Sequence, residues 1–332
     1  MRTDRVLLSE GHVNEITTHE GMPCGEPSMP LTPIKIILSA GAGTVAGGDN
    51  QKICELLARI FSENQIDADI SLAQSGAEVT QLAQDAARGP YKVMVAAGGD
   101  GTVNSVAAAA VDGGKILGVL PLGTLNHFAR DLKIPSDLEA AAQTIVAGHT
   151  TDVDVAEVNN RIFVNNSSLG LYPTIVRERQ KRERLGFRKW PAFFWATIQA
   201  LRRYPFLDVQ LRVNGDLLDR LTPFVFVGNN EYAMDLFNIG LRERLDRGVL
   251  SIYITHRTSR LKLISLALRA VFGSLRDDKD FLALASDEVK IQTGRKRLRV
   301  AFDGEVDVME TPLQYRVRPG ALRVIVPSAE AD

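Results

Sequence analysis

The chain has 332 residues, enough for one large or two medium domains, and its 45% hydrophobic and 24% charged residues are typical of globular proteins. A formal net charge of −1 excludes the strongly basic field of nucleic-acid-binding domains, so no nucleic-acid partner is expected. The two cysteines fall in a predicted tail and a predicted helix, which favours a reducing, cytoplasmic location. There is neither an apolar run of ~18 residues nor a signal-peptide pattern.

The first part of the chain predicts alternating strands and helices. Residues 1–32 are polar and contain several glycines and prolines, so we expect a flexible tail there. Helical patterns follow predicted strands throughout residues 33–150, which is typical of a parallel sheet with helices on its faces. The strands are predicted at 34–38, 68–72, 93–97 and 116–120, and three of the helices around 53–61, 79–86 and 103–111.

The third predicted strand ends in Gly98-Gly99-Asp100-Gly101-Thr102, directly before a predicted helix. This arrangement suits phosphate, because glycines let the backbone approach an anion and a helix start offers unpaired N–H groups. Asp100 would repel a bare phosphate, so it indicates either a Mg²⁺ ion between carboxylate and phosphate or a bond to a ribose or a loop N–H. A ligand-free connection between strand and helix is the alternative.

The fourth predicted strand ends in a second turn, Gly123-Thr124, which Asn126 follows. Two neighbouring turns of this kind place both Gly-Thr pairs on the carboxyl edge of one sheet, where open α/β sheets bind ligands. The loop after the first strand, residues 39–44, is expected beside them. Asn104 and Asn126 either touch a ribose or only tie the turns.

From about residue 150 the pattern changes to short strands of alternating polarity, several of which are predicted to pair as hairpins. One of these strands, 298–302, runs into Asp303-Gly304-Glu305. Because residues i and i+2 of a strand point the same way, and Gly304 permits a turn, we expect both carboxylates to aim inward. One could accept a proton while the other orients the acceptor or binds Mg²⁺. A hairpin turn with solvated acids is the alternative.

Together, the two glycine turns and the late Asp-Gly-Glu resemble the catalytic domain of the diacylglycerol kinase and sphingosine kinase superfamily, in particular the compact bacterial lipid kinases. The resemblance covers roughly residues 33–327. It implies an α/β fold: an N-terminal parallel-sheet nucleotide-binding domain of the NAD kinase/diacylglycerol kinase type, and a C-terminal antiparallel β-sandwich domain for the lipid. We assign residues 33–150 and a returning strand at 319–328 to the first domain, and residues 151–318 to the second.

The same resemblance implies ATP- and Mg²⁺-dependent phosphorylation of the hydroxyl of diacylglycerol or a related long-chain lipid, with Asp303 or Glu305 as the general base. Asp100 is the candidate for the catalytic Mg²⁺. A non-catalytic, nucleotide-responsive membrane-binding module and an NAD kinase-like transferase are the alternatives. The expected nucleotide-binding residues are Gly41, Gly43, Thr44, Gly98, Gly99, Asp100, Gly101, Thr102, Asn104, Gly123, Thr124 and Asn126.

Three positions depart from the family pattern. His127 and Ser105 stand where many relatives carry acids. The turn at residues 245–250 resembles a loop that holds a structural Mg²⁺ in some relatives, but Arg247 interrupts its usual Asp-Gly pair. Asp246 is nevertheless a candidate ligand of that ion.

Residues 177–195 combine many basic side chains with phenylalanines and both tryptophans of the chain. Cations and aromatic rings together suit the surface of an anionic membrane. We therefore expect peripheral contact with the inner membrane face, where a lipid substrate would be met. A solvated charged helix followed by a helix packed in the core is the alternative.

Overall fold

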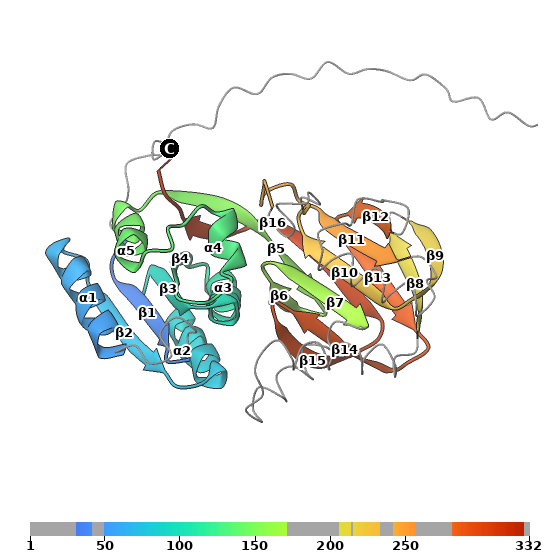
Figure 1. The fold of residues 1–332 in the computed structure, drawn as a ribbon, viewed down its shortest axis with the longest axis horizontal. Helices are drawn as coiled ribbons and strands as arrows, with labels where there is room; N and C mark the ends of the chain where they lie inside the picture. Colours follow the sequence, from blue (N-terminus) through green and yellow to red (C-terminus); the bar gives the residue numbers. More distant parts are fainter. Residues whose placement is uncertain are drawn as a thin grey trace, which may run out of the picture.

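The computed structural model describes residues 31–41, 50–170, 206–213, 215–232, 242–255 and 281–328. An α/β half with a parallel sheet lies beside a half built of antiparallel strands, which confirms the predicted fold class (Figure 1). Gly43, Thr44, the basic and aromatic segment 177–195 and nearly all of the predicted tail lie outside the described residues. In the described part of the chain, no helix is long and apolar enough to cross a membrane.

The parallel strands of the α/β half are those predicted from the apolar runs, and their spatial order is β2-β1-β3-β4. The central strand β3 is buried at every position, because helices cover both faces of the sheet. Helix α2 packs against α3, and α1 packs against α5. The elements are β1 (Ile34–Ser39), α1 (Asn50–Glu63), β2 (Ala68–Ala73), α2 (Gly76–Arg88), β3 (Val93–Gly98), α3 (Asp100–Gly113), β4 (Ile116–Pro121), α4 (His127–Asp131) and α5 (Leu138–Ala147).

Short polar side chains set where two of these helices begin. The Ser75 hydroxyl accepts the N–H of Glu78 at the start of α2, and the Asp137 carboxylate accepts the N–H of Ala140 at the start of α5. Such caps satisfy backbone donors that have no partner within the helix. Helix α5 ends at Gly148 in the left-handed conformation, as helices commonly do.

One sheet runs through both halves of the molecule. The long strand β16 (Leu313–Ile325) lies parallel to β4 through Val324 and Leu117, and it pairs antiparallel with β5 (Thr150–Val158). It also pairs with β13 (Glu288–Thr293), so the sheet continues from the parallel strands into the β-rich half. In Figure 1, β5 and β16 extend from one half to the other. This sheet includes strands from both sides of the domain boundary predicted near residue 150, and the division into two domains stays a prediction.

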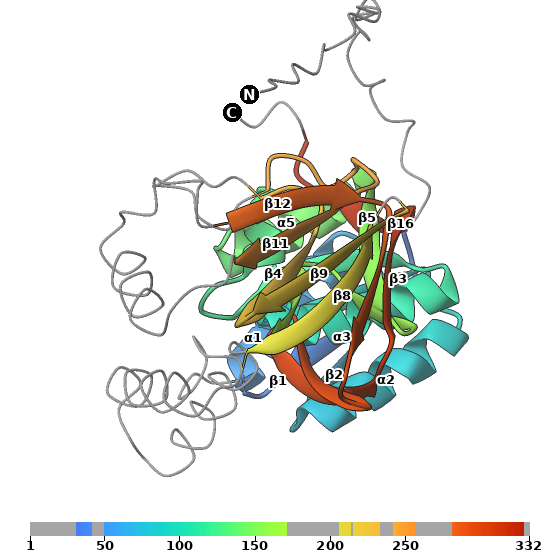
Figure 2. The ribbon, with the colours of Figure 1, turned by 90° about the vertical axis from the view of Figure 1, so that its right-hand side faces the viewer.

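The β-rich half is a sandwich of two sheets. One is the continuation of the long sheet, through β16, β13, β8 and β9, and the other has the strand order β12-β11-β10-β7-β14-β15 (Figure 2). Strand β8 alternates between buried and exposed residues, because one face meets the core and the other does not. The remaining strands are β6 (Arg161–Phe163), β7 (Asn166–Gly170), β8 (Leu207–Val213), β9 (Asp216–Thr222), β10 (Phe224–Asn229), β11 (Leu250–Thr255), β12 (Phe281–Ser286), β14 (Arg297–Phe302) and β15 (Glu305–Glu310).

Candidate active site

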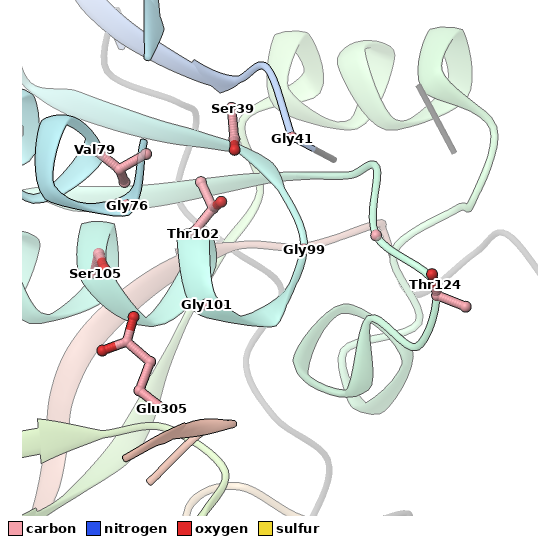
Figure 3. Close-up of a pocket in the computed structure, with 11 residues that line it drawn as sticks. Ser39, Gly41, Gly76, Val79, Gly99, Gly101, Thr102, Ser105, Thr124 and Glu305 are labelled. Atoms are coloured by element: carbon pink, nitrogen blue, oxygen red, sulfur yellow. The ribbon is translucent and has the colours of Figure 1, made fainter. Parts of the chain in front are cut away.

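A cavity of about 350 Å³ opens where parallel strands of the α/β half end, and Glu305 of the sandwich closes one side of it (Figure 3). The other contributions come from the end of β1, the first turns of α2 and α3, and the turn after β4. The lining residues are Ser39, Gly41, Gly76, Val79, Gly99, Gly101, Thr102, Ser105, Gly123, Thr124 and Glu305.

The first glycine turn connects β3 to α3 and leaves no room for a side chain at Gly98. A Cβ atom on Gly98 would lie 2.5 Å from the Thr102 hydroxyl oxygen, which explains why glycine is needed there. Within the described residues, no side chain caps the N-terminus of α3 at Gly99. The first N–H groups of this helix therefore remain available to an anion, and the helix dipole favours negative charge at the same place.

The second turn lies against the first. The Leu122 N–H donates to the Gly98 carbonyl at 3.0 Å, and a Cβ on Gly123 would lie only 2.5 Å from the Cα of Gly99. Asn126 adopts a left-handed conformation, and its amide both accepts the Gly123 N–H and donates to the Gly123 carbonyl, at 2.9 Å each. Of the two interpretations given for Asn126, the structure shows the tie that holds the turn.

Asp100 and Asn104 lie one turn apart on α3, and neither lines the cavity. Each has a buried Oδ1 atom without a hydrogen-bond partner. An unsatisfied carboxylate oxygen beside the first glycine turn fits contact with a cation. The described residues contain no group of three or more ligating side chains that could hold a metal alone. Mg²⁺ does not require one, because it commonly uses one or two carboxylates together with waters and substrate phosphates.

The two late acids do not face the same space, so the expectation that they point the same way is wrong. Asp303 and Gly304, with φ values of 45° and 83°, form a two-residue turn that pairs Phe302 with Glu305. Glu305 lines the cavity, and a Cβ on Gly101 would lie 3.9 Å from its Oε1 atom. Figure 3 shows its carboxylate directed toward the first turns of α3.

Asp303 is instead buried and holds the backbone between β6 and β7. Its Oδ2 accepts the Val164 N–H at 2.7 Å, and its Oδ1 accepts the N–H groups of Asn165 and Asn166 at 2.9 and 3.1 Å. Its side chain is thus committed to a structural task. Burial raises the pKa of Asp303 to about 6, although these hydrogen bonds and the Arg242 charge oppose the increase.

The raised pKa of Asp303 predicts a specific pH dependence of stability. Folding favours the protonated form of Asp303. The contribution of Asp303 to the free energy of unfolding is therefore greatest below its ordinary pKa of 3.8, and it declines as pH rises through about 6. At ~1.4 kcal/mol per pKa unit, the loss is up to about 3 kcal/mol. Asp303→Asn does not titrate. In urea titrations, the stability of the wild type relative to this variant is therefore expected to decrease between pH 4 and pH 7, and a constant difference would contradict the pKa.

Desolvation of its carboxylate at the cavity raises the pKa of Glu305 above its ordinary value, while Arg161 lowers this pKa and Asp307 raises it further. These two modulating residues form an exposed ion pair with an N–O distance of 3.5 Å. The cavity thus holds a carboxylate whose charge is only partly balanced, which is suited to accepting a proton.

We expect the two modulating residues to shift the acid limb of the rate profile in opposite directions. Arg161→Gln removes a cation and raises the pKa of Glu305, so the limb moves to higher pH, and Asp307→Asn moves it to lower pH. Exposed charges are screened, so each shift should be about 0.2–0.7 pH unit. The measurement is kcat/KM against pH. Arg297→Gln, which breaks the exposed Arg297–Glu310 pair on the same hairpin, is the control. Shifts in the same direction would contradict this electrostatic account.

Asp246 forms no part of a metal site in the described structure. It is ion-paired with Arg244 at 2.8 Å on the surface, and Arg244 lowers its pKa. Protein groups hold the surrounding loop instead: the buried Asp154 carboxylate accepts the Gly248 N–H at 2.6 Å and the Gly320 N–H at 2.8 Å. The interpretation of Asp246 as a ligand of structural Mg²⁺ gains no support from this arrangement.

Three lining residues were not among the expected site residues: Gly76, Val79 and Ser105. A fourth, Ser39, was expected only as the start of the loop 39–44. Ser39 ends the first strand, and Gly76 begins α2 after the second strand. Both therefore lie at the same carboxyl edge of the sheet as the two glycine turns. Their position directly after predicted parallel strands could have indicated that they line the cavity. Ser105 lies one helical turn beyond Gly101 and was noted only as a departure from the family pattern.

Comparison with known families agrees with this architecture. Residues 34–158 match the model of the diacylglycerol kinase catalytic domain, and residues 171–326 match that of the YegS C-terminal NAD kinase beta sandwich-like domain. The match to the catalytic domain supports a lipid kinase enzyme. Together the two matches cover most of the chain, and they confirm the resemblance to the diacylglycerol kinase family that its glycine turns and Asp-Gly-Glu element predicted. Membership of a kinase family implies a nucleotide substrate.

Curated relatives are similar to this chain in sequence, and solved structures are similar to it in fold. A diacylglycerol kinase of Staphylococcus aureus (strain JH9) is 27% identical over 217 residues, which cover 61% of this chain and 69% of that protein. Protein sll0036 of Synechocystis is 27% identical over 241 residues, covering 70% of this chain but only 54% of the relative. A crystal structure of a diacylglycerol kinase from Bacillus anthracis str. Sterne gives a TM-score of 0.65 at 21% identity, covering 89% of this chain and 97% of that one. A second structure from that strain gives 0.72 at 22% identity, covering 91% and 98%.

Proposed function

We propose that this chain transfers the γ-phosphate of ATP to the hydroxyl of diacylglycerol or a related long-chain lipid. The observation that carries the proposal is the position of Glu305 across one cavity from the two glycine turns. Phosphoryl transfer requires bound phosphates, neutralisation of their charge, and an aligned hydroxyl. The cavity and the adjoining start of α3 offer a candidate group for each of these requirements.

The first turns of α3 and the Gly123-Thr124 turn bind the terminal phosphates. Free N–H groups at the start of α3 donate to phosphate oxygens, and the hydroxyls of Thr102 and Thr124, which both line the cavity, add two more donors. Asp100 would hold Mg²⁺, since its buried Oδ1 has no other partner. When bound, this ion neutralises the negative charge that the phosphates carry.

Glu305 is the general base. Among the described residues, no hydrogen bond or ion pair occupies its carboxylate, and its raised pKa favours proton acceptance. The lipid hydroxyl enters between the α/β half and the sandwich, gives its proton to Glu305, and attacks the γ-phosphorus. The bond from this phosphorus to the bridging oxygen of the β-phosphate breaks, and ADP leaves. Asp303 is unsuited to this role, because three backbone N–H groups already occupy its two oxygens.

The lipid is met at the cytoplasmic surface of a membrane, and residues 177–195 make the contact. The basic and aromatic composition of this segment supports the proposal, because such side chains favour the anionic headgroup layer. Enclosure of the hydroxyl between the two halves would also limit hydrolysis of ATP by water.

A lipid panel tests the proposed function. The purified chain is incubated with ATP, Mg²⁺ and mixed micelles of diacylglycerol, monoacylglycerol, sphingosine or ceramide, and products are detected by mass spectrometry. We expect phosphate to be added to diacylglycerol or another long-chain alcohol. ATP binding without any lipid product would favour a nucleotide-responsive binding module, and phosphorylation of added NAD would favour an NAD kinase-like transferase.

A further inference from the structure

Arg242 is a fully buried side chain outside the cavity that contacts both halves of the molecule. Its side chain has 0% exposed surface and forms an ion pair of 2.7 Å with Asp131, whose side chain is 1% exposed. Its backbone N–H donates to the same carboxylate at 3.2 Å. Asp131 is the last residue of α4, the short helix that follows the Gly123-Thr124 turn. One end of the Arg242 guanidinium is therefore anchored to the phosphate-binding half.

The other end of the guanidinium reaches the sandwich. Nη1 donates to the carbonyls of Val164 at 2.6 Å and Asn229 at 3.0 Å, and Nη2 donates to Oδ1 of Asn165 at 2.7 Å. The segment that contains Val164 and Asn165 is also the segment whose N–H groups bind the Asp303 carboxylate. Arg242 thus binds the carbonyl group of Val164, and Asp303 binds the N–H group of the same residue.

A continuous set of contacts results, leading from one side of the cavity to the other. It runs from α4 through Asp131 and Arg242 to residues 164–166, and from there through Asp303 to Glu305, two residues further along the hairpin. A buried ion pair is weak evidence for stability, since apolar residues of similar volume often stabilise as well or better. Its directional hydrogen bonds instead fix geometry, because the planar guanidinium satisfies all of these acceptors in one arrangement.

We propose that Arg242 is a positioning residue that holds Glu305 opposite the two glycine turns, acting through residues 164–166 and Asp303. The inference rests on the proposed function, because it concerns the same site. This positioning role of Arg242 can be distinguished from a general stabilising role. A positioning residue affects proton transfer at Glu305 but leaves nucleotide binding at the glycine turns unchanged, and its effect disappears when Glu305 no longer acts as a base.

Arg242→Lys is the test variant, because lysine keeps a positive charge beside Asp131 but lacks the fork that reaches Asn165 and the two carbonyls. Arg244→Lys is the matched control, since Arg244 lies two residues away in an exposed ion pair with Asp246. We expect Arg242→Lys to lower kcat about 10- to 100-fold, with a Kd for ATP within about twofold of wild type, because misplacement of a reacting group by ~1 Å has effects of this size. The control should retain wild-type kcat.

A double-mutant cycle separates positioning from folding. In a Glu305→Gln background, Arg242→Lys should cause no further loss of residual turnover, because the residue through which it acts is already gone. If Arg242→Lys does not fold by circular dichroism, Asn165→Ala replaces it in the cycle, since it removes one link of the same set.

Wild-type kcat in the folded variant, or an equal further loss in the Glu305→Gln background, would overturn the inference while leaving the proposed function intact. A wild-type chain that makes no lipid phosphate would instead overturn the proposed function itself.

Discussion

Glu305→Gln is expected to lower kcat by about 10²- to 10⁴-fold, the usual contribution of a general base. Glutamine keeps the size of the side chain but cannot accept the hydroxyl proton. The Kd for ATP should change little, because the proposed phosphate site is at the glycine turns and not at Glu305. Steady-state transfer of phosphate to diacylglycerol, together with calorimetric ATP titration, measures the two effects separately.

Glu310→Gln provides the control for this prediction. Glu310 lies on the same strand, β15, but forms an exposed pair with Arg297 at 3.0 Å and does not line the cavity. Its variant should turn over like the wild type. If Glu305→Gln retained more than about half of the wild-type kcat, Glu305 could not be the base, and the chemical assignment of the cavity would be lost.

Gly123→Ala is expected to impair nucleotide binding more than any other single methyl addition at the cavity. The new Cβ would lie 2.5 Å from both the Gly99 Cα and the Asn126 Oδ1, so the two turns must separate. Overpacking of this kind costs about 1–3 kcal/mol. If the cost falls on the phosphate-binding geometry, the Kd for ATP rises roughly 5- to 150-fold, which isothermal titration calorimetry would detect.

Gly294→Ala is the matched control, because a Cβ at Gly294 meets nothing within 4 Å and this residue lies in the turn between β13 and β14, away from the cavity. Its affinity for ATP should equal that of the wild type. An unchanged Kd in a folded Gly123→Ala variant would mean that the nucleotide does not use the contact between the two turns.

Local patterns were sufficient to predict the α/β half. The apolar runs of β1, β3 and β4 are buried on both faces, so they are visible as continuous runs in the sequence. The glycine turns follow these strands directly, and parallel strands bring their carboxyl ends to one edge. The sequence alone therefore places five of the lining residues at one site: Gly99, Gly101, Thr102, Gly123 and Thr124.

The roles of the two late acids could not be read from spacing alone. The rule that residues i and i+2 point the same way applies within a strand, but Asp303 and Gly304 form the turn between two strands. The positive φ at Asp303 directs its side chain to the backbone N–H groups of residues 164–166. Only Glu305, the first residue of the next strand, remains at the cavity.

Arg242 shows the other limit of sequence reasoning. Its partners Asp131, Val164 and Asn229 are separated from it by 111, 78 and 13 residues, so no local pattern signals their contact. The continuity of the sheet through β16 has the same origin, since it depends on long-range strand pairing. Asp246 was assigned from a local motif, but its partner is the neighbouring Arg244.

The most direct test of the account is a crystal structure of the chain with Mg²⁺ and a non-hydrolysable ATP analogue. We predict that the β- and γ-phosphates lie on the N–H groups at the start of α3 and on the Gly123-Thr124 turn, with Glu305 facing the γ-phosphate across the space left for a hydroxyl. An analogue bound elsewhere, or phosphates directed away from Glu305, would contradict the account.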